Sequence, residues 1–266
     1  MSLPILYIFK IGGNIIDDDN QLNAFLKSFA QLQGTKILIH GGGKIASDIS
    51  KGLGIEPKMV DGRRITDDET LKVVTMVYGG LINKNIVAKL QSFGCNAIGL
   101  SGADANILPA HKRPIKEIDY GFVGDIEEDR IPSETINMFL QNNLVPVIAP
   151  LTHDCKGNML NTNADTISSA ISIAMSKKYK VELFYCFEKT GVLKDINDVN
   201  SVIPEISFSY YDTLKKEGVI NDGMMPKLDN AFLALQKGVQ SVTIIHANAI
   251  DEILQNKQPK GTQLLF

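Results

Sequence analysis

Short apolar runs alternate with amphipathic stretches along most of the 266-residue chain. An apolar run of about four to eight residues is typical of a buried strand, and apolar residues spaced three and four apart are typical of a helix face. The apolar runs predict strands at 3–9, 36–40, 96–100, 144–149, 181–187 and 241–246. The amphipathic stretches predict helices at 22–32, 44–53, 66–90, 133–140, 165–175, 226–235 and 249–254.

This alternation of strands and helices predicts an α/β fold. It is typical of a mainly parallel sheet with helices on both faces, so we expect a three-layer α/β/α sandwich. The polar stretch 151–157 is interpreted as a loop and marks a boundary between two lobes, about 1–155 and about 156–266. Segment 58–65 is interpreted as a hairpin or an irregular extended segment, and segment 111–129 has the composition of a hairpin. Ligands of open α/β sheets bind at the carboxyl ends of the strands, so functional residues are expected in loops that follow strands.

Polar residues and glycines indicate where several helices begin and end. Asn20 and Ser133 are placed to cap the helices that follow them, and Thr66 opens a capping box with Glu69. Gly34 is placed to end the first helix.

The composition is that of a globular protein without a polyanionic partner. Hydrophobic residues make up 44% and charged residues 21% of the chain, which excludes a disordered chain. The 27 basic and 30 acidic side chains give a net charge of −3, which argues against binding to nucleic acid or to an anionic membrane. No stretch has the pattern of a signal peptide or the roughly 20 apolar residues of a membrane span. The three cysteines are far apart and form no CxxC pair, so we expect reduced thiols in a cytoplasmic protein.

Two glycine-rich loops follow the first two predicted strands and could hold phosphate groups. Residues 10–13 read Lys-Ile-Gly-Gly, and residues 40–43 read His-Gly-Gly-Gly and precede a helix. Glycines let backbone N–H groups approach an anion closely, and a helix N-terminus adds partial positive charge. Tight turns between strand and helix also favour glycine, but two such loops on successive strands, one led by Lys10, favour an anion site.

The second glycine loop partly matches three known motifs. A Walker A loop is excluded because Lys44 is followed by Ile45 and not by serine or threonine. Residues 41–46 nearly match the dinucleotide-binding fingerprint, and Asp61 lies about 20 residues on, as that fingerprint requires. HGGG also occurs in the oxyanion loop of lipases, whose nucleophile motif fails here at Ala103. The loop alone therefore leaves a kinase, a dehydrogenase and a hydrolase open.

Three further clusters combine charged residues with helix starts. Residues 61–66 place two arginines before a helix, where a guanidinium group can bind a carboxylate through two hydrogen bonds. Residues 161–165 precede an apolar helix that Asn163 can cap. Residues 222–227 place Lys227 in the first turn of a helix, where a cation is unfavourable for the helix dipole unless an anion binds nearby.

Taken together, these motifs resemble those of the amino-acid kinase family, and within it the members that phosphorylate an N-acylated glutamate in arginine biosynthesis. The matching segments occur in the order of the family and span nearly the whole chain: 10–13, 40–43, 62–66, 161–165, 223–227 and 261–262. The resemblance implies an acyl-glutamate lobe followed by a nucleotide lobe. It also implies that the γ-phosphoryl group of ATP passes to the γ-carboxylate of the acylated glutamate, which gives an acyl phosphate.

The resemblance also assigns roles to residues of this chain. Lys10 and Lys227 would neutralise the transferring phosphoryl group, and Asp165 would hold their two ammonium groups in place. Arg64 and Asn161 would bind the α-carboxylate and acyl-amide end of the substrate. Backbone amides would bind the substrate at Gly42 and Gly43 and the nucleotide phosphates at Gly12, Gly13 and Gly191.

ATP and Mg²⁺ are the cofactors that the resemblance implies. Mg²⁺ would be held mainly by the nucleotide phosphates, with no metal ligand from the protein. The attacking carboxylate is already deprotonated, so positioning and charge neutralisation suffice and no general base is needed.

The chain departs from the family pattern in three places. Residues 187–191 read Phe-Glu-Lys-Thr-Gly where relatives carry Ser/Thr-Asp-Val-x-Gly beside the nucleotide. The chain begins at its first strand, without the N-terminal helix of arginine-inhibited relatives, and we therefore expect a homodimer without arginine feedback. Arg63 lies beside Arg64, with Lys58 nearby. This extra cation raises the hypothesis of a second carboxylate on the acyl group, as in N-succinyl-L-glutamate rather than N-acetyl-L-glutamate.

Other functions stay open at this point. Carbamate, aspartate and uridylate kinases and glutamate 5-kinase are neighbours within the family. The Arg64–Asn161 pair favours an acylated amino acid over carbamate or a nucleotide. The sequence shows no C-terminal regulatory domain, which disfavours aspartate kinase and glutamate 5-kinase. An NAD-binding oxidoreductase would leave Lys10 and Lys227 unexplained. A non-catalytic nucleotide sensor would be expected to lack one of Lys10, Asp165 or Lys227, and all three are present.

Overall fold

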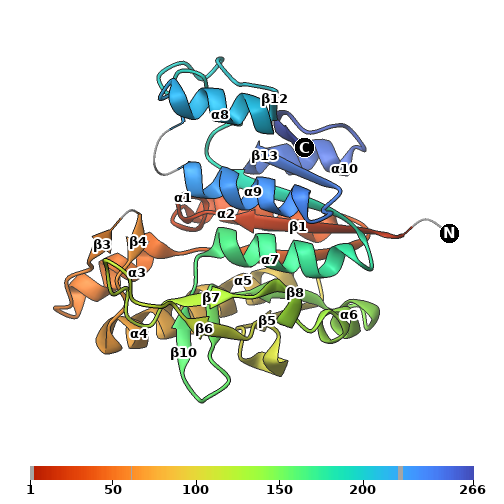
Figure 1. Ribbon diagram of the computed structural model, residues 1–266. Coiled ribbons are helices and arrows are strands. Elements are labelled where there is room, and N and C mark those ends of the chain that lie inside the picture. Colours follow the sequence, from red (N-terminus) through yellow and green to blue (C-terminus); the bar gives the residue numbers. More distant parts are fainter. Residues whose placement is uncertain (1–2, 61, 221–223) are drawn as a thin grey trace.

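The computed structural model describes residues 3–60, 62–220 and 224–266. Its centre is an eight-stranded sheet with helices on both faces (Figure 1). In spatial order the strands are β12 (Glu205–Ser207), β14 (Gly261–Leu265), β13 (Ser241–His246), β11 (Lys180–Phe187), β1 (Ile5–Ile11), β2 (Thr35–His40), β8 (Val145–Ile148) and β5 (Ala97–Leu100). Neighbouring strands pair in parallel except β13 with β14. The expected three-layer α/β/α fold with a mainly parallel sheet is confirmed.

Helices and three small hairpins surround the sheet. The helices are α1 (Gly13–Ile16), α2 (Asp19–Gln31), α3 (Gly43–Gly52), α4 (Asp68–Val74), α5 (Asn83–Ser92), α6 (Ser133–Gln141), α7 (Ala164–Ser176), α8 (Phe208–Lys216), α9 (Met225–Gln236) and α10 (Ile250–Leu254). The hairpins pair β3 (Met59–Val60) with β4 (Arg63–Arg64), β6 (Ala110–Lys112) with β7 (Gly124–Ile126), and β9 (Leu151–His153) with β10 (Met159–Asn161). Within the described residues, no helix has both the length and the apolar character needed to cross a membrane.

The side chains of β1 divide between two hydrophobic cores, one on each face of the sheet. Leu6 and Ile8 belong to the core under α7 and α9, whereas Phe9 and Ile11 belong to the core under α2 and α5. Successive side chains of a strand point to opposite faces, so Lys10 shares the face of Leu6 and Ile8. The strand thereby brings its lysine to the side of the sheet on which α7 and α9 lie side by side (Figure 1).

Several predicted helix caps are wrong by one or two residues. Asp18, not Asn20, caps α2, and Asp67, not Thr66, caps α4; each carboxylate accepts backbone N–H groups of its helix. Ser133 is the first residue of α6 rather than its cap. Where several good capping residues follow one another, each could accept the first N–H groups of the helix, and residue type alone does not decide which of them is used.

Gly34 does not end α2, because the last turn of that helix is closed by a buried lysine. The helix ends at Gln31, and Gly34 lies in the following turn with a φ of +97°. The Lys36 ammonium group donates to the carbonyl oxygens of Phe29, at 2.7 Å, and Ala30, at 3.1 Å. A cation near the helix C-terminus satisfies carbonyl groups that have no partner within the helix.

The long helix predicted over 66–90 is continuous but not uniform. Between α4 and α5 the chain forms a π-helical segment, Thr75–Ile82, which the spacing of apolar residues did not predict. Its side chains Tyr78 and Ile82 lie against the second glycine loop. A Cβ atom placed on Gly42 would lie 2.2 Å from Ile82 Cδ1 and 3.5 Å from the Tyr78 ring.

The predicted hairpins at 58–65 and 111–129 are confirmed, but the loop predicted at 151–157 is wrong. Its first residues form β9, which pairs with β10, so the boundary expected near 155 falls in the turn of a hairpin. Five of the α-helices and strands in the described residues were not predicted at all: α1, β10, β12, α8 and β14. They are short, and β12, α8 and β14 lie where the sequence lacks clear periodicity.

Candidate active site

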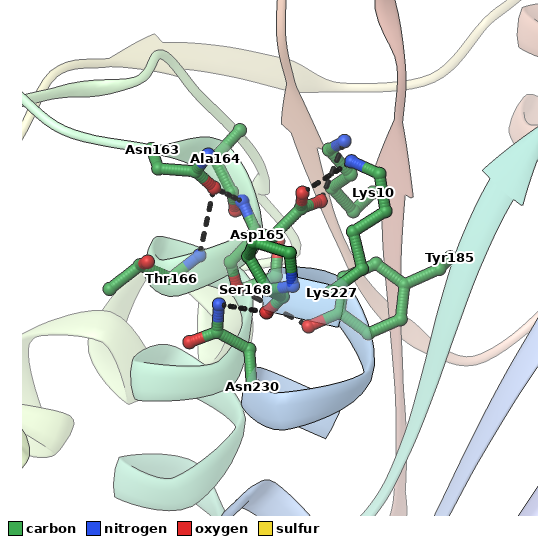
Figure 2. Close-up of polar contacts among 10 residues, drawn as sticks. Lys10, Asn163, Ala164, Asp165, Thr166, Ser168, Tyr185, Lys227 and Asn230 are labelled. Carbon is green, nitrogen blue, oxygen red and sulfur yellow. Dashed lines mark hydrogen bonds and ion pairs between the residues drawn. The ribbon is translucent and has the colours of Figure 1, made fainter. Parts of the chain in front are cut away.

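Three charged side chains meet where β1 ends and where α7 and α9 begin (Figure 2). Lys10 Nζ lies 2.7 Å from Asp165 Oδ1, and Lys227 Nζ lies 2.7 Å from Asp165 Oδ2. One carboxylate therefore binds two ammonium groups, one on each oxygen. The three residues come from distant parts of the sequence, and their predicted convergence is observed.

The backbone around Asp165 is held by local hydrogen bonds. Asn163 caps α7, as predicted, and its side-chain oxygen accepts the N–H groups of Asp165, at 2.7 Å, and Thr166, at 3.3 Å (Figure 2). The hydroxyl of Tyr185, on β11, donates to the backbone carbonyl of Asp165 at 3.2 Å. These contacts fix the first turn of α7 and so aim the carboxylate at the end of β1.

Burial makes the charges of this cluster depend on one another. Asp165 is 3% exposed and Lys10 is 5% exposed. Burial alone would raise the pKa of Asp165, but the adjacent Lys10 and Lys227 ammonium groups lower it to about 2. Burial lowers the pKa of Lys10, opposed by the attraction of Asp165 and reinforced by the repulsion of Lys227. One anion held by two cations leaves a net positive charge that faces the adjoining cavity.

A cavity of about 910 Å³ adjoins the cluster and is lined by both glycine loops. Gly41 donates its N–H to the carbonyl of Ile11 at 3.1 Å, which holds the two loops side by side. Gly42 has a φ of +138°, a value that favours glycine. Of the predicted site residues, eight line this cavity: Lys10, Gly13, Gly42, Gly43, Arg64, Asn161, Asp165 and Lys227.

Arg64 and Asn161, which the resemblance assigns to the substrate, both line this cavity. Arg64 is buried, and its Nη2 donates to the carbonyl of Gly43 and to Ser47 Oγ, each at 2.8 Å. Its Nη1 is buried without a hydrogen-bond partner among the described residues. Asn161 donates from its side chain to Thr66 Oγ1 at 3.0 Å. Arg63 also lines the cavity, but its side chain is exposed.

Two of the predicted glycines lie outside the lining of the cavity. Gly12 precedes Gly13 and packs on the ring of Phe187. Gly191 is buried against β14, where a Cβ atom would lie 2.6 Å from Thr262 Oγ1. Thr262 accepts the N–H of Val192 at 2.8 Å, which accounts for the Gly-Thr pair near the C-terminus. Asp61 and Gly223, which belong to predicted motifs, lie outside the described residues.

Sequence reasoning missed two residues of this region. Arg113 lines the cavity from the β6–β7 hairpin, and the sequence interpretation did not single it out within the largely polar stretch 111–129. Its Nε donates to Asp125 at 3.0 Å, and its Nη1 is buried without a partner in the part of the chain that the structure describes. Phe187 was noted only as a departure from the family pattern, yet its ring lies beside both lysines.

The comparison with protein families decides where the chain belongs. Residues 6–246 match the model of the amino acid kinase family. The chain belongs to the amino-acid kinase family. The acetylglutamate kinase of Cytophaga hutchinsonii is 58% identical over 98% of both chains, and that of Bacteroides fragilis is 55% identical over 92% of this chain and 93% of the relative.

The fold of this amino-acid kinase is also found among solved structures. An N-acetylglutamate synthase from Neisseria gonorrhoeae, complexed with coenzyme A and N-acetyl-glutamate, superimposes with a TM-score of 0.82 at 19% identity. The match covers 98% of this chain and 59% of the synthase. At this identity the likeness shows the shared fold alone.

The candidate site of this amino-acid kinase offers cations and backbone amides but few free oxygen ligands. The described residues contain no group of three histidine, cysteine, aspartate or glutamate side chains that could hold a metal ion. Asp165 is the only carboxylate among the described residues that line the cavity, and both its oxygens are taken by lysines. The lysines and Arg64 in this lining are suited to bind anions.

Proposed function

We propose that this amino-acid kinase transfers the γ-phosphoryl group of ATP to the γ-carboxylate of N-acetyl-L-glutamate, as a step of arginine biosynthesis. The observation that carries the proposal is the pair of lysines on one carboxylate, beside a cavity lined by two glycine loops. The likeness to two proteins named acetylglutamate kinase, over 92% or more of this chain, supports the choice of substrate.

The proposed reaction needs no proton transfer. A γ-carboxylate oxygen attacks the γ-phosphorus of ATP while the bond to the bridging oxygen of ADP breaks, which gives the acyl phosphate and ADP. Lys10 and Lys227 reduce the repulsion between the carboxylate and the phosphoryl group and stabilise charge that spreads over the phosphoryl oxygens. Asp165 keeps the two ammonium groups at a fixed separation, which is the positioning that such a transfer requires.

The other end of the proposed substrate would lie along Arg64 and Asn161. The guanidinium group of Arg64 is suited to bind the α-carboxylate, and Asn161 to bind the acyl amide. Gly42 and Gly43 would direct N–H groups to the γ-carboxylate, and Gly12 and Gly13 would do so for the phosphates of ATP. The nucleotide would enter as its Mg²⁺ complex, because the described site supplies no free carboxylate for a metal. Gly191 lies outside the lining of the cavity, so it would affect nucleotide binding only indirectly, by letting its segment pack closely on β14.

A hydroxamate assay tests the proposal. The protein is incubated with ATP, Mg²⁺ and one acceptor in the presence of hydroxylamine, which traps an acyl phosphate as a coloured iron hydroxamate. We expect ADP and hydroxamate in equal amounts with N-acetyl-L-glutamate, and neither with L-glutamate, L-aspartate, carbamate or UMP. ADP with UMP or carbamate but not with an acylated glutamate would assign another branch of the family. Absence of ADP with every acceptor would overturn the kinase function.

A second candidate substrate, N-succinyl-L-glutamate, is favoured by Arg113. This arginine binds Asp125 through Nε and Nη2, and its buried Nη1 has no hydrogen-bond partner among the described residues. It lines the same cavity as Arg64, and its guanidinium group lies over the Tyr120 ring with 5.4 Å to the centroid. A succinyl group ends in a carboxylate that this nitrogen could bind, whereas an acetyl group ends in a methyl. The exposed Arg63, on which the sequence hypothesis rested, has no comparable constraint.

The acyl preference can be measured separately from the kinase reaction. If Arg113 binds a second carboxylate, wild-type kcat/KM is higher for N-succinyl- than for N-acetyl-L-glutamate, and Arg113→Gln lowers only the succinyl value, by about tenfold or more. Lys112→Gln is the matched control, because it removes the same charge from the neighbouring exposed position. A wild-type preference for the acetyl substrate that Arg113→Gln leaves unchanged would refute the second carboxylate and leave the kinase function intact.

The two lobes of the chain would divide the two substrates between them. The lobe of about 1–155 would carry the acylated glutamate and that of about 156–266 the nucleotide, and the cavity is lined by residues of both. We further propose a cytoplasmic homodimer without arginine feedback. The exposed Met76 and Leu81 on the π-helical segment are apolar side chains that a second copy could cover. Light scattering after size-exclusion chromatography and an assay with added arginine test these two features.

A further inference from the structure

Phe187 is the last residue of β11 and lies behind the two lysines. The Nζ atoms of Lys10 and Lys227 lie over its ring, 5.3 Å and 5.2 Å from the centroid. The ring is partly buried and does not line the cavity. Phe187 therefore contacts the charged cluster from the protein side, and a ligand in the cavity would meet the lysines first.

The ring is held in place by its neighbours. It stacks on the ring of Tyr185 at 7° between the planes and 6.5 Å between centroids, and the hydroxyl of Tyr185 donates to the backbone of Asp165. On another side it meets Gly12, where a Cβ atom would lie 3.5 Å from the edge of the ring. The Phe187 ring thus contacts the first glycine loop and both ammonium groups. It also stacks on Tyr185, which binds the backbone of Asp165.

The cluster has an electrostatic problem that such a ring can reduce. Two ammonium groups share one carboxylate, so they repel each other and are only partly neutralised. The face of an aromatic ring is negative and attracts a cation, more strongly where water is excluded. A second carboxylate would also attract the lysines, but its charge would repel the incoming phosphoryl group and cancel the net positive charge of the site. An aromatic face holds both cations without adding a formal charge.

We propose that Phe187 is a positioning residue for phosphoryl transfer. Its ring holds the ammonium groups of Lys10 and Lys227 by cation–π contact, and so helps Asp165 to keep them in place beside the cavity. This inference rests on the proposed function, because it explains how the two lysines stay available to an anion. It predicts that the electrostatic character of the ring matters, and not only the volume it fills. The contact acts on the lysines and so affects turnover rather than binding of the acylated glutamate.

Fluorinated phenylalanines at position 187 test this inference with little change in size. Each added fluorine weakens the negative face of the ring, so we expect kcat to fall stepwise from phenylalanine to its mono-, di- and trifluoro forms, by about tenfold over the series. KM for the acylated glutamate should stay within about twofold of wild type, since the ring does not line the cavity. The matched control is the same series at Phe184, which lies on β11 and stacks on Phe9, and over whose ring the described structure places no lysine or arginine. Fluorination at 184 should leave kcat unchanged.

Ordinary substitutions provide a second measurement. Phe187→Leu keeps an apolar side chain and removes the ring, so it should lower kcat by about tenfold. Phe187→Tyr keeps an aromatic ring and should retain most of the wild-type kcat. Equal kcat across the fluorinated series, or a loss of kcat in Phe187→Tyr as large as that in Phe187→Leu, would overturn the inference while the hydroxamate assay still supports the kinase. An inactive wild-type protein in that assay would instead overturn the proposed function itself.

Discussion

Asn83 donates a hydrogen bond from its side-chain amide to Nε2 of His40, at 3.2 Å. The other ring nitrogen, Nδ1, lies 2.8 Å from the carbonyl oxygen of Gly41, which can only accept. These partners assign the proton to Nδ1 and leave the ring neutral. His40 is fully buried, and burial lowers its pKa to about 4. The histidine of the second glycine loop is thus a fixed neutral support for the backbone of that loop, and takes no part in proton transfer.

The buried neutral His40 should make folding stability depend on pH. Its pKa is about 4 in the folded protein and 6.5 in an unfolded chain. Between these values the unfolded state binds one more proton, so stability rises with pH across this window and is lost as pH falls. The full effect is about 3 kcal/mol. Urea unfolding of wild type and His40→Gln between pH 4 and pH 7 measures it, with the variant showing the flatter profile.

His111→Gln is the control for this experiment, because its side chain is exposed on the β6–β7 hairpin. Its unfolding free energy should follow the wild-type curve. Identical pH profiles for wild type and His40→Gln would contradict the neutral, buried state inferred for His40.

Removing one lysine of the cluster should affect turnover more than folding. Lys227→Ala leaves Asp165 paired with Lys10, so no buried charge loses its last partner. We expect kcat to fall by about a hundredfold or more and the unfolding free energy to change by about 1 kcal/mol. Lys10→Ala should show the same order of loss in kcat. Lys237→Ala, in the exposed pair with Glu128, serves as a control. Near-normal turnover in both cluster variants would contradict the assignment of this site.

Removing the carboxylate of the cluster should lower stability more than removing either lysine. Asp165→Asn leaves the buried Lys10 beside Lys227 with no anion between them, and breaking such a buried pair costs about 3–5 kcal/mol. The unfolding free energy of Asp165→Asn at neutral pH should fall by this amount, and more than that of either lysine variant. Chemical denaturation of the three variants in one buffer gives this ranking directly. A stability of Asp165→Asn equal to that of Lys227→Ala would show that the ammonium groups do not depend on this carboxylate.

The two glycines of the second loop should respond differently to alanine. Gly42→Ala meets a φ of +138° and would place its methyl 2.2 Å from Ile82 Cδ1, so it should lower both stability and kcat. Gly43→Ala has nothing within 4 Å of its added methyl and should fold normally. A rise in KM for the acylated glutamate in Gly43→Ala at unchanged melting temperature would place the substrate against this residue. Normal kinetics in Gly43→Ala would indicate that the substrate binds elsewhere in the cavity.

Site residues that lie in short sequence motifs could be predicted from the sequence. Residues whose role depends on contacts between distant segments could not. Lys10 and Lys227 were identified because each lies in a short motif next to a strand end or a helix start, where parallel topology brings ends together. Asp18 was missed as a cap because three aspartates and an asparagine follow one another at 17–20, and each of these side chains can accept the helix N–H groups.

Arg113 could not be assigned from sequence, because its importance comes from a hairpin folding over the cavity and from an unsatisfied nitrogen that only the structure reveals. Phe187 is similar: an aromatic residue at the end of a buried strand is ordinary in sequence. Its relation to two lysines depends on the register of β11 against β1, in which Lys10 lies opposite Tyr185.

The π-helical segment Thr75–Ile82 has a consequence for the length of the chain. A π-helix pairs each N–H with the carbonyl five residues before it, whereas an α-helix pairs it with the carbonyl four residues before, so a π-helical segment holds more residues per turn. A deletion of one residue here can be absorbed by a return to α-helical pairing. An insertion has no such outlet and would rotate α5 relative to α4, which would move Asn83 away from His40. The segment should therefore tolerate the loss of a residue better than the gain of one.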